Sequence, residues 1–385
     1  MSEQPELKLV DFPPAVLARI SPELSLQRHL AIGLRPNLRT FEEFKTVQIN
    51  DGGLSRYSST NSNNESDVLG SSILRSGNTT VICTIRGGII EEDILGENNN
   101  EDADAVNAIF AKDKESIINQ ENLIDSAPIY PIVEIERGRN GPPTDEEMNL
   151  SQKLYETFLH SKILSKSSLK VKVGLKSKND KNEIEILYND ENSEFQLGPK
   201  RSWNYILYCK FKIFSRSGPL FDLIWISLIS ALKQTKLPYA YIDENAADIK
   251  IPIKMTGNFG TIREQYAITC DDEKFNNLIL NNEEIGYSSN FGVISLDKNV
   301  SNNNEEDEKK MEIDINDENN DSILLVDLEG EEEEISCKNL INVVVDSKGE
   351  NLKSLTLTGN IDKSSLQKAI DLSKKRSKFL INQEI

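Results

Sequence analysis

The residue types that carry most enzyme chemistry are scarce in this sequence. It contains two histidines, His29 and His160, which leave almost no raw material for a histidine-based triad or a multi-histidine metal site. The four cysteines lie far apart and never form a CxxC pair: Cys83, Cys209, Cys270 and Cys337. Their spacing predicts neither a zinc site nor a redox motif, and it favours a reducing compartment.

Charge narrows the choice of function further. The 385 residues include 44 Lys and Arg against 63 Asp and Glu, for a formal net charge of −19 at pH 7. A freestanding nucleic-acid-binding protein normally carries a basic surface, so this balance argues against one. Much of the negative charge falls in two Asn-, Glu- and Asp-rich stretches, about 91–125 and 297–321. We expect both to be disordered insertions, and solvated loops are a more natural interpretation than partner-binding segments.

Between these stretches, alternating apolar residues predict strands and helices. Residues 68–85 predict a hairpin that turns at Ser76-Gly77-Asn78, and 129–135 a further strand. Thr144 and Glu147 form a T-x-x-E capping box that opens a helix. Strands are expected at 169–173, 184–188 and 203–214, followed by a buried helix over 219–236. That helix contains the most apolar stretch of the chain, which is too short to cross a bilayer.

A second series of strand patterns followed by a helix pattern begins after residue 238. Strands are expected at 239–242, 265–270, 278–280, 287–296, 322–328, 341–345 and 354–357, before a closing helix over 364–380. Leu366, Ile370, Ser373 and Ser377 trace the inward stripe of that helix, and Arg376 belongs to a basic run that suits its C-terminal dipole. The pattern predicts an α+β protein of two similar sheet-and-helix halves. The N-terminus shows no secretory signal.

Five blocks of sequence resemble the RNase PH-like ring subunits of the eukaryotic RNA exosome. In chain order they are 21–44 (which includes L-R-P-N-L-R-T-F), 69–85, 131–138 (P-I-V-E-I-E-R-G), 218–238 and 323–375. The resemblance implies an RNase PH-like fold of two ββαβα-type halves, similar to ribosomal protein S5 domain 2. We therefore expect an N-terminal arm at 1–40 and halves at 41–237 and 238–385.

Active relatives hold inorganic phosphate with a D-G-G-T-R-T-like loop before the buried helix. The corresponding run here begins at Arg216 and continues through Pro219, Leu220 and Phe221. Proline has no N–H to donate, and leucine replaces the guanidinium that would grip phosphate. The resemblance thus implies that the phosphate cradle is degenerate.

Active relatives also place two metal-binding aspartates six residues apart between two late strands. Aligned with the 331–340 run, the first becomes Glu333 or Glu334 and the second becomes Asn339 or Leu340. A hard cation needs convergent anionic oxygens, and this pair supplies at most one. The four consecutive glutamates are more readily explained as a repelling, solvated run than as a metal site. We expect no bound metal and no cofactor.

Arginines that line the ring's pore in relatives correspond here to Arg137 and Arg139, the candidate RNA-channel residues. Phosphate contacts by arginine are independent of base sequence. Pairing of these arginines with Glu136, Asp145 or Glu146 is an equally good interpretation. For Arg28, Arg35 and Arg39 we favour structural or inter-subunit pairing.

The expected function is a non-catalytic exosome ring subunit that helps to organise an RNA channel during 3′-to-5′ RNA processing and rRNA maturation, with no catalytic residue of its own. The resemblance implies other RNase PH-like subunits, S1/KH-type cap subunits, a hydrolytic nuclease and RNA as partners, no membrane, and a location in nucleus, nucleolus and cytoplasm. Two alternatives remain: an active phosphate-dependent 3′-to-5′ exoribonuclease, and an acidic scaffold without an RNA role.

Overall fold

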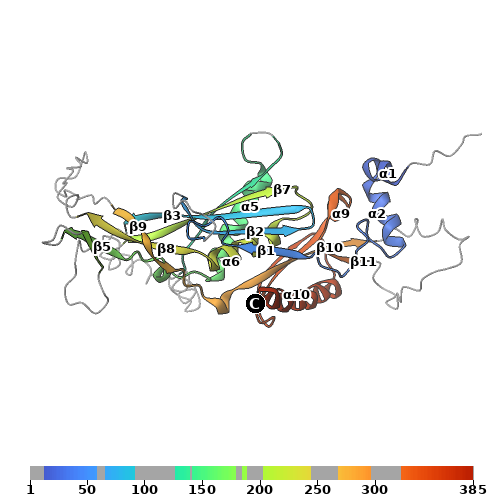
Figure 1. Ribbon diagram of the computed structural model, residues 1–385. Helices are drawn as coiled ribbons and strands as arrows, with labels where there is room; N and C mark the ends of the chain where they lie inside the picture. The colour runs from blue at the N-terminus through green and yellow to red at the C-terminus, as the bar shows by residue number, and fades with distance from the viewer. Residues whose placement is uncertain are drawn as a thin grey trace, which may run out of the picture.

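A five-stranded sheet forms the centre of the molecule (Figure 1). The computed structural model describes residues 13–58, 66–91, 126–138, 141–178, 184–188, 203–243, 268–295 and 322–384. The strands of this first sheet are ordered β1 (Val47–Asp51), β2 (Val68–Ser76), β3 (Thr79–Glu91), β7 (Trp203–Phe214) and β4 (Tyr130–Ile135). Only β4 runs parallel to its neighbour. The β2–β3 hairpin is confirmed, and Gly77 at its turn has the positive φ of +57° that glycine tolerates.

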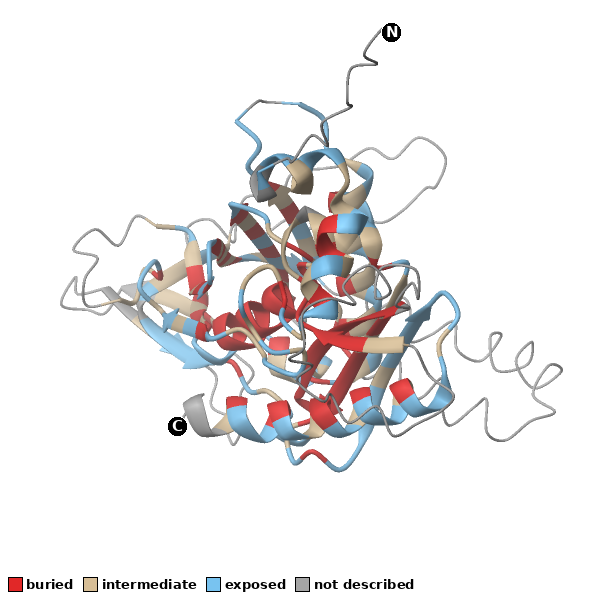
Figure 2. Ribbon diagram, turned by 90° about the vertical axis from the view of Figure 1, so that its right-hand side faces the viewer, coloured by how far each residue is buried: buried red, intermediate tan, exposed pale blue. Residues whose placement is uncertain are grey.

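Two helices cover one face of this sheet. They are α5 (Asp145–Ser161), which lies beside β4, and α6 (Phe221–Lys233), which lies across β2 and β3. Residues 221–232 of α6 are all buried, as the apolar sequence predicts, and Figure 2 shows this helix deep inside the molecule. The Trp225 indole donates a hydrogen bond to the Gly286 carbonyl at 2.7 Å, so α6 also anchors the second sheet.

A four-stranded antiparallel sheet follows later in the chain. Its order is β11 (Ser322–Val326), β10 (Gly286–Ser295), β12 (Asn339–Asp346) and β13 (Leu352–Thr358), with α9 (Gly330–Ser336) between β11 and β12. The closing helix α10 (Lys363–Glu384) packs on β10 and β12. Ser373 and Ser377 are buried, whereas Leu366 and Ile370 are half-buried. Arg376 does not lie at the solvated end of the helix, because its side chain is buried against an acidic residue.

A third sheet was not expected from the sequence. It has the order β6 (Ile184–Tyr188), β5 (Val173–Lys178), β8 (Lys236–Asp243) and β9 (Ile268–Asn277), and it lies at the opposite end of the molecule from α1 (Pro14–Ile20) and α2 (Pro22–Ala31) (Figure 1). The expected boundary at 237/238 falls inside β8, and the division into halves stays a prediction. The two acidic insertions lie outside the described residues, apart from Glu91 at the end of β3.

Two expected strands are wrong. Residues 166–169 form a 3₁₀ turn, η2 (Lys166–Leu169), and β5 begins only at Val173. Residues 278–281 pair with no strand; a second 3₁₀ turn, η3 (Asn282–Glu284), follows them. Both segments carry apolar residues at strand-like spacing, Leu-Lys-Val-Lys-Val at 169–173 and Leu-Ile-Leu at 278–280, but of these Leu169 and Leu278 alone are buried, so the apolar pattern imitated a strand. No described helix has the length and apolar character needed to cross a membrane.

The start of α5 fixes the segment that carries Arg137. The Glu147 carboxylate accepts hydrogen bonds from the backbone N–H of Thr144 at 2.6 Å, from its hydroxyl at 3.0 Å and from the Ile135 N–H at 2.7 Å. This confirms the predicted capping box and ties the helix to the end of β4. Burial alone would raise the pKa of Glu147, but these hydrogen bonds hold that pKa below its usual value.

We expect Glu147→Gln to lower the free energy of unfolding by about 1 kcal/mol at neutral pH. The lowered pKa means that the carboxylate stabilises the fold above the unfolded-state pKa of about 4.3, and that this contribution is lost as pH falls through the folded-state pKa. Urea unfolding of both proteins from neutral to acidic pH tests this. The difference should shrink toward zero in acid, and the exposed control Glu156→Gln should show little change; a pH-independent difference would contradict the assignment.

Candidate functional site

Four charged residues form one network beside the N-terminal end of α6. Arg216 donates to Glu146 at 2.7 Å and to both carboxylate oxygens of Glu334, at 3.0 and 2.5 Å. Arg137 donates to the same Glu146 at 3.2 Å and to the Thr144 hydroxyl at 3.3 Å. The structure therefore brings together residues from three separately predicted groups: the channel arginine, the phosphate loop and the glutamate run. The pairing of Arg137 with Glu146 is one of the alternatives that the sequence left open.

The rest of the phosphate-loop segment turns into the core. Leu220 and Phe221 are buried, and the Phe221 ring stacks on Trp225 with centroids 5.9 Å apart. Gly218 has a φ of +82°, and a Cβ atom there would lie 2.1 Å from the Leu328 carbonyl oxygen. Gly218 is thus required for the close approach of this loop to the segment after β11. The loop offers no described basic side chain except Arg216.

Glu333 is completely enclosed by its partners. Its carboxylate forms a two-point ion pair with Arg35, with Nε 2.8 Å from Oε1, and also accepts the Glu329 N–H at 2.8 Å. The Arg35 guanidinium further donates to the carbonyls of Val326 at 2.5 Å and Asp327 at 3.0 Å. Both side chains of the ion pair are fully buried. Arg35 and Arg39 therefore have structural partners, as expected, and Arg39 pairs with Glu329.

A second buried carboxylate precedes Glu333 by six residues, and the sequence analysis did not select it. Asp327 Oδ2 accepts a hydrogen bond from Arg376 and another, of 3.0 Å, from the Lys45 N–H. Close by, burial and the negative charge of Asp327 raise the pKa of Asp222 to about 6. One Asp222 oxygen, Oδ1, is buried with no hydrogen-bond partner. The signal in the sequence was an aspartate placed directly after the last residue of β11.

The remaining predicted residues lie apart from this network. Asn339 and Leu340 begin β12, where the Asn339 side-chain oxygen accepts the Asn360 N–H at 3.1 Å. Arg139 lies outside the described residues. Within the described ranges, no group of three or more His, Cys, Asp or Glu is arranged to hold a metal ion.

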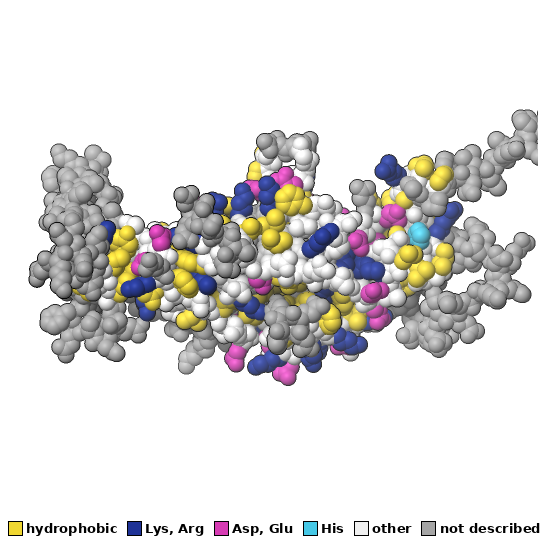
Figure 3. Space-filling model, viewed as in Figure 1, with side chains coloured by type: hydrophobic (Ala, Val, Ile, Leu, Met, Phe, Trp, Pro, Cys, Tyr) yellow, Lys and Arg dark blue, Asp and Glu magenta, His cyan; other side chains and the backbone are white. Residues whose placement is uncertain are grey.

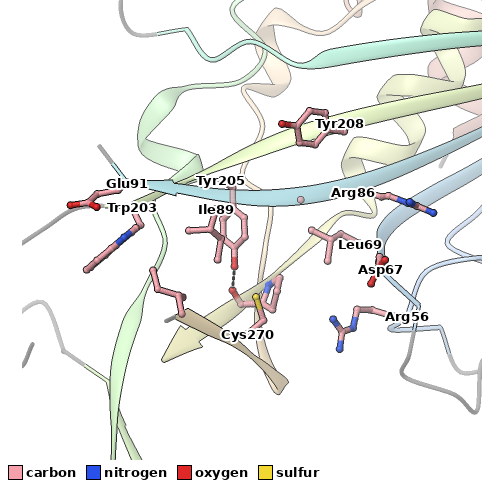
Figure 4. Close-up of a pocket in the computed structure, with 13 residues that line it drawn as sticks. Arg56, Asp67, Leu69, Arg86, Ile89, Glu91, Trp203, Tyr205, Tyr208 and Cys270 are labelled. Atoms are coloured by element: carbon pink, nitrogen blue, oxygen red, sulfur yellow. Dashed lines mark hydrogen bonds between the residues drawn. The ribbon is translucent and has the colours of Figure 1, made fainter. Parts of the chain in front are cut away.

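A separate groove of about 920 Å³ lies near the other end of β7, between β3, β7 and the β8–β9 hairpin (Figure 4). Its lining mixes Arg56 and Arg86 with Asp67 and Glu91 and includes the aromatic rings of Trp203, Tyr205 and Tyr208. The Tyr205 hydroxyl donates to the Pro238 carbonyl across it. None of the sequence-predicted site residues lines this groove. Acidic and basic side chains are interspersed on the described surface in Figure 3.

Most of the residues that build the network lie in a segment that matches a known family. Residues 43–238 match the family described as "3′ exoribonuclease family, domain 1" (RNase_PH), which is half of the chain. The chain belongs to the RNase PH family. The matched segment runs from just before β1 into β8 and therefore contains Arg137, Arg216 and the whole of α6.

Similar proteins agree with this membership. The chain is 24% identical over 239 residues to "Exosome complex component rrp43" of Schizosaccharomyces pombe, an alignment covering 62% of this chain and 66%, just under two thirds, of that protein. The fold resembles a chain of the Archaeoglobus fulgidus exosome with RNA bound to the active site, at a TM-score of 0.53 and 13% identity, covering 96% of this chain and 100% of that one. It also resembles a chain of an archaeal exosome core, at a TM-score of 0.50 and 14% identity over 96% and 98% of the two chains.

The buried Arg35–Glu333 pair allows a test of how this RNase PH-family chain holds its second sheet. We expect Arg35→Met to destabilise the protein by about 3–5 kcal/mol, because Glu333 would stay buried without a countercharge. Thermal and urea unfolding of the full chain measure this. The exposed pair of Lys368 and Glu42 supplies the control, and Lys368→Met should change the free energy of unfolding by less than about 1 kcal/mol.

Arg35→Met combined with Glu333→Met should recover much of that loss, because both charges are then removed from the interior. An Arg35→Met protein as stable as the unmodified chain would contradict the enclosed pair.

Proposed function

We propose that this protein is a non-catalytic ring subunit of an RNA exosome, where it organises the RNA channel and holds neighbouring subunits. The observation that carries the proposal is that the basic and acidic groups of its degenerate site neutralise one another. Arg216 is bound to Glu146 and Glu334, and Arg35 to Glu333. The family membership, the rrp43 relative and the fold of the archaeal exosome chains support a structural ring role.

Phosphate binding is disfavoured by the loop before α6. Inorganic phosphate needs several donors that converge on its oxygens, usually backbone N–H groups together with an arginine fork. Pro219 lacks the N–H, Leu220 is buried, and Arg216 already has two carboxylate partners. A phosphate ion would have to displace both of those partners before it could bind to Arg216. We infer that the cradle is lost.

Divalent metal binding meets a similar obstacle. Family enzymes use two carboxylates six residues apart, and Asp327 and Glu333 have that spacing here. Arg35 and the Glu329 N–H engage both oxygens of Glu333, and Arg376 binds Asp327. Two guanidinium groups therefore lie where a cation would need to approach. We infer that the residues present do not fit a divalent ion.

The spacing of Asp327 and Glu333 is the one observation that favours an active phosphorolytic exoribonuclease. Asp327 and Glu333 together provide two carboxylates, whereas the pairing of Glu333 or Glu334 with Asn339 or Leu340 provided one. The arginine partners and the absent cradle weigh against activity, because both the metal and the phosphate would have to be bound in one reacting complex. An acidic scaffold without any RNA role is the remaining alternative.

We further propose that the partners are other RNase PH-like ring subunits, S1/KH-type cap subunits, a hydrolytic nuclease carried by the complex and RNA. The proposed locations are nucleus, nucleolus and cytoplasm, where such a complex would process and degrade RNA. Arg137 remains the candidate channel contact because it is about one third exposed despite its pairing with Glu146.

The purified chain is expected to release no nucleoside diphosphates from single-stranded RNA in the presence of inorganic phosphate and Mg²⁺ or Mn²⁺. The missing cradle alone should remove transition-state stabilisation of several kcal/mol. Chromatographic separation of the products measures this, and Arg216→Gln provides a matched protein with the same background contaminants. Phosphate-dependent release that Arg216→Gln abolishes would establish the enzyme alternative instead.

Assembly is tested by purifying the tagged full chain from cells and identifying its partners by mass spectrometry. We expect other RNase PH-like subunits in equal amounts, because an acidic chain gains from basic neighbours in a mixed ring and repels copies of itself. Recovery of a homomeric ring, or of a stable complex without RNase PH-like subunits, would refute the ring role.

A further inference from the structure

The third sheet presents three tyrosines on one face. Gly174 of β5 pairs with Tyr188 of β6 on one side and with Tyr241 of β8 on the other, so these residues share a face of the sheet. Tyr239 lies two residues before Tyr241 and therefore on the same face, where its ring packs against Tyr188 with centroids 5.0 Å apart. The opposite face of β8 and β9 lines the groove of Figure 4 through Pro238, Ile268 and Cys270.

The absence of a side chain at position 174 creates room for one of these rings. A Cβ atom on Gly174 would lie 2.8 Å from the Tyr188 ring and 2.7 Å from the Leu187 carbonyl oxygen. Strand interiors usually exclude glycine, and a glycine there often marks a place where another group lies close to the backbone. The Tyr188 ring therefore rests on the backbone of β5.

Hydrogen bonds hold two of the rings in place. The Tyr188 hydroxyl donates to Asp271, and the Tyr239 hydroxyl donates to the Asn276 side-chain oxygen at 2.7 Å. All three tyrosines are half-buried, so part of each ring still reaches the surface. A ligand would meet aromatic surface that needs little further ordering.

Each tyrosine also has a lysine beside its ring. The ammonium nitrogens of Lys274, Lys172 and Lys176 lie 4.7, 5.7 and 5.5 Å from the ring centroids of Tyr188, Tyr239 and Tyr241, respectively. Lys172 and Lys274 are exposed. These six residues, which we call the tyrosine–lysine face, bring three positive charges onto one face of a chain whose formal net charge is −19, beside the single carboxylate of Asp271 that binds the Tyr188 hydroxyl.

We propose that the tyrosine–lysine face binds single-stranded RNA. Aromatic rings on which bases stack, combined with lysines that contact the phosphates, are what sequence-independent binding of a single strand requires. The choice of RNA over single-stranded DNA rests on the proposed exosome role. The ability to stack bases and contact phosphates follows from the tyrosines and lysines themselves. The face lies on β5, β6, β8 and β9, apart from the Arg137–Arg216 network at the start of α5 and α6.

An acidic protein segment is a less suitable occupant. It would pair with the lysines, but it would gain little from three rings placed side by side on a sheet face. Bases gain from both features, because every base has a flat surface that stacks on an aromatic ring.

The experiment measures fluorescence anisotropy of labelled oligouridylate with the full chain, in the assembly in which it purifies. Tyr241→Leu removes one stacking ring and should weaken binding about fivefold or more, whereas Tyr241→Phe keeps the ring and should stay within about twofold of the unmodified chain. Lys172→Gln with Lys274→Gln should lower the slope of log affinity against log salt by roughly one unit. The control pair, Lys348→Gln with Lys368→Gln, removes two exposed lysines elsewhere and should leave that slope unchanged.

Ultraviolet cross-linking to the same oligonucleotide, followed by peptide mapping, should recover peptides that contain Tyr188, Tyr239 or Tyr241. The proposal would be overturned if no cross-linked peptide contained one of these tyrosines. It would also be overturned if Tyr241→Leu and Tyr241→Phe bound the oligonucleotide with equal affinity, or if the chain bound duplex RNA as tightly as the single strand. A further contrary result would be that polyglutamate displaces the RNA and that Tyr241→Leu leaves the affinity for polyglutamate unchanged, since an acidic segment would then be the occupant of the face. If the chain assembles with other RNase PH-like subunits but the tyrosine–lysine face binds no RNA, this inference alone is refuted. If the face binds RNA but the chain joins no ring, the proposed function alone is refuted.

Discussion

The buried guanidinium of Arg35 is the contact on which the arrangement of this chain depends. It joins a loop near the N-terminus to residues 326–333 through two carbonyls and one carboxylate, so that α2, β11 and α9 form a single packed unit. A charge in the interior is tolerated only when its partner and its remaining donors are satisfied. Since Arg35 meets both conditions, the same interaction that fixes the architecture also occupies Glu333.

The same pairing of opposite charges within the chain is found at the other charged residues of the candidate site. Arginines bind the buried carboxylates Asp327 and Glu333, and carboxylates bind Arg216 and Arg137, whose side chains are each about one third exposed. The charges gathered at the start of α5, in the loop before α6 and around α9 are thus satisfied by partners within the chain. Because Glu146 lies on α5 and Glu334 on α9, a ligand that competed for Arg216 would also have to break the contacts that this arginine makes with both helices.

Local signals predicted the local structure well. The Ser76-Gly77-Asn78 turn, the Thr144–Glu147 capping box and the continuous apolar run of α6 each depend on neighbours in sequence, and each is confirmed. The third sheet was missed because β5 and β8 pair over a long separation that no local pattern reports. Arg376 was assigned to a helix end by its position in the chain, although its partner Asp327 could be found only in three dimensions. Asp327 was not selected from the sequence, because its burial and its contact with Arg376 appear only once β11 and α10 are packed together.

The long insertion after β3 has a consequence for how this fold can vary. It leaves the sheet at Glu91, opposite Trp203, and the chain returns at Ser126, before β4, so the twelve paired positions between β3 and β7 are complete without it. The entropy of closing a flexible loop rises only with the logarithm of its length, by about 0.6 kcal/mol for each doubling. A change in the number of residues between Glu91 and Ser126 would therefore leave the pairing of β3 with β7 in place, and the register of the first sheet does not depend on the length of that connection.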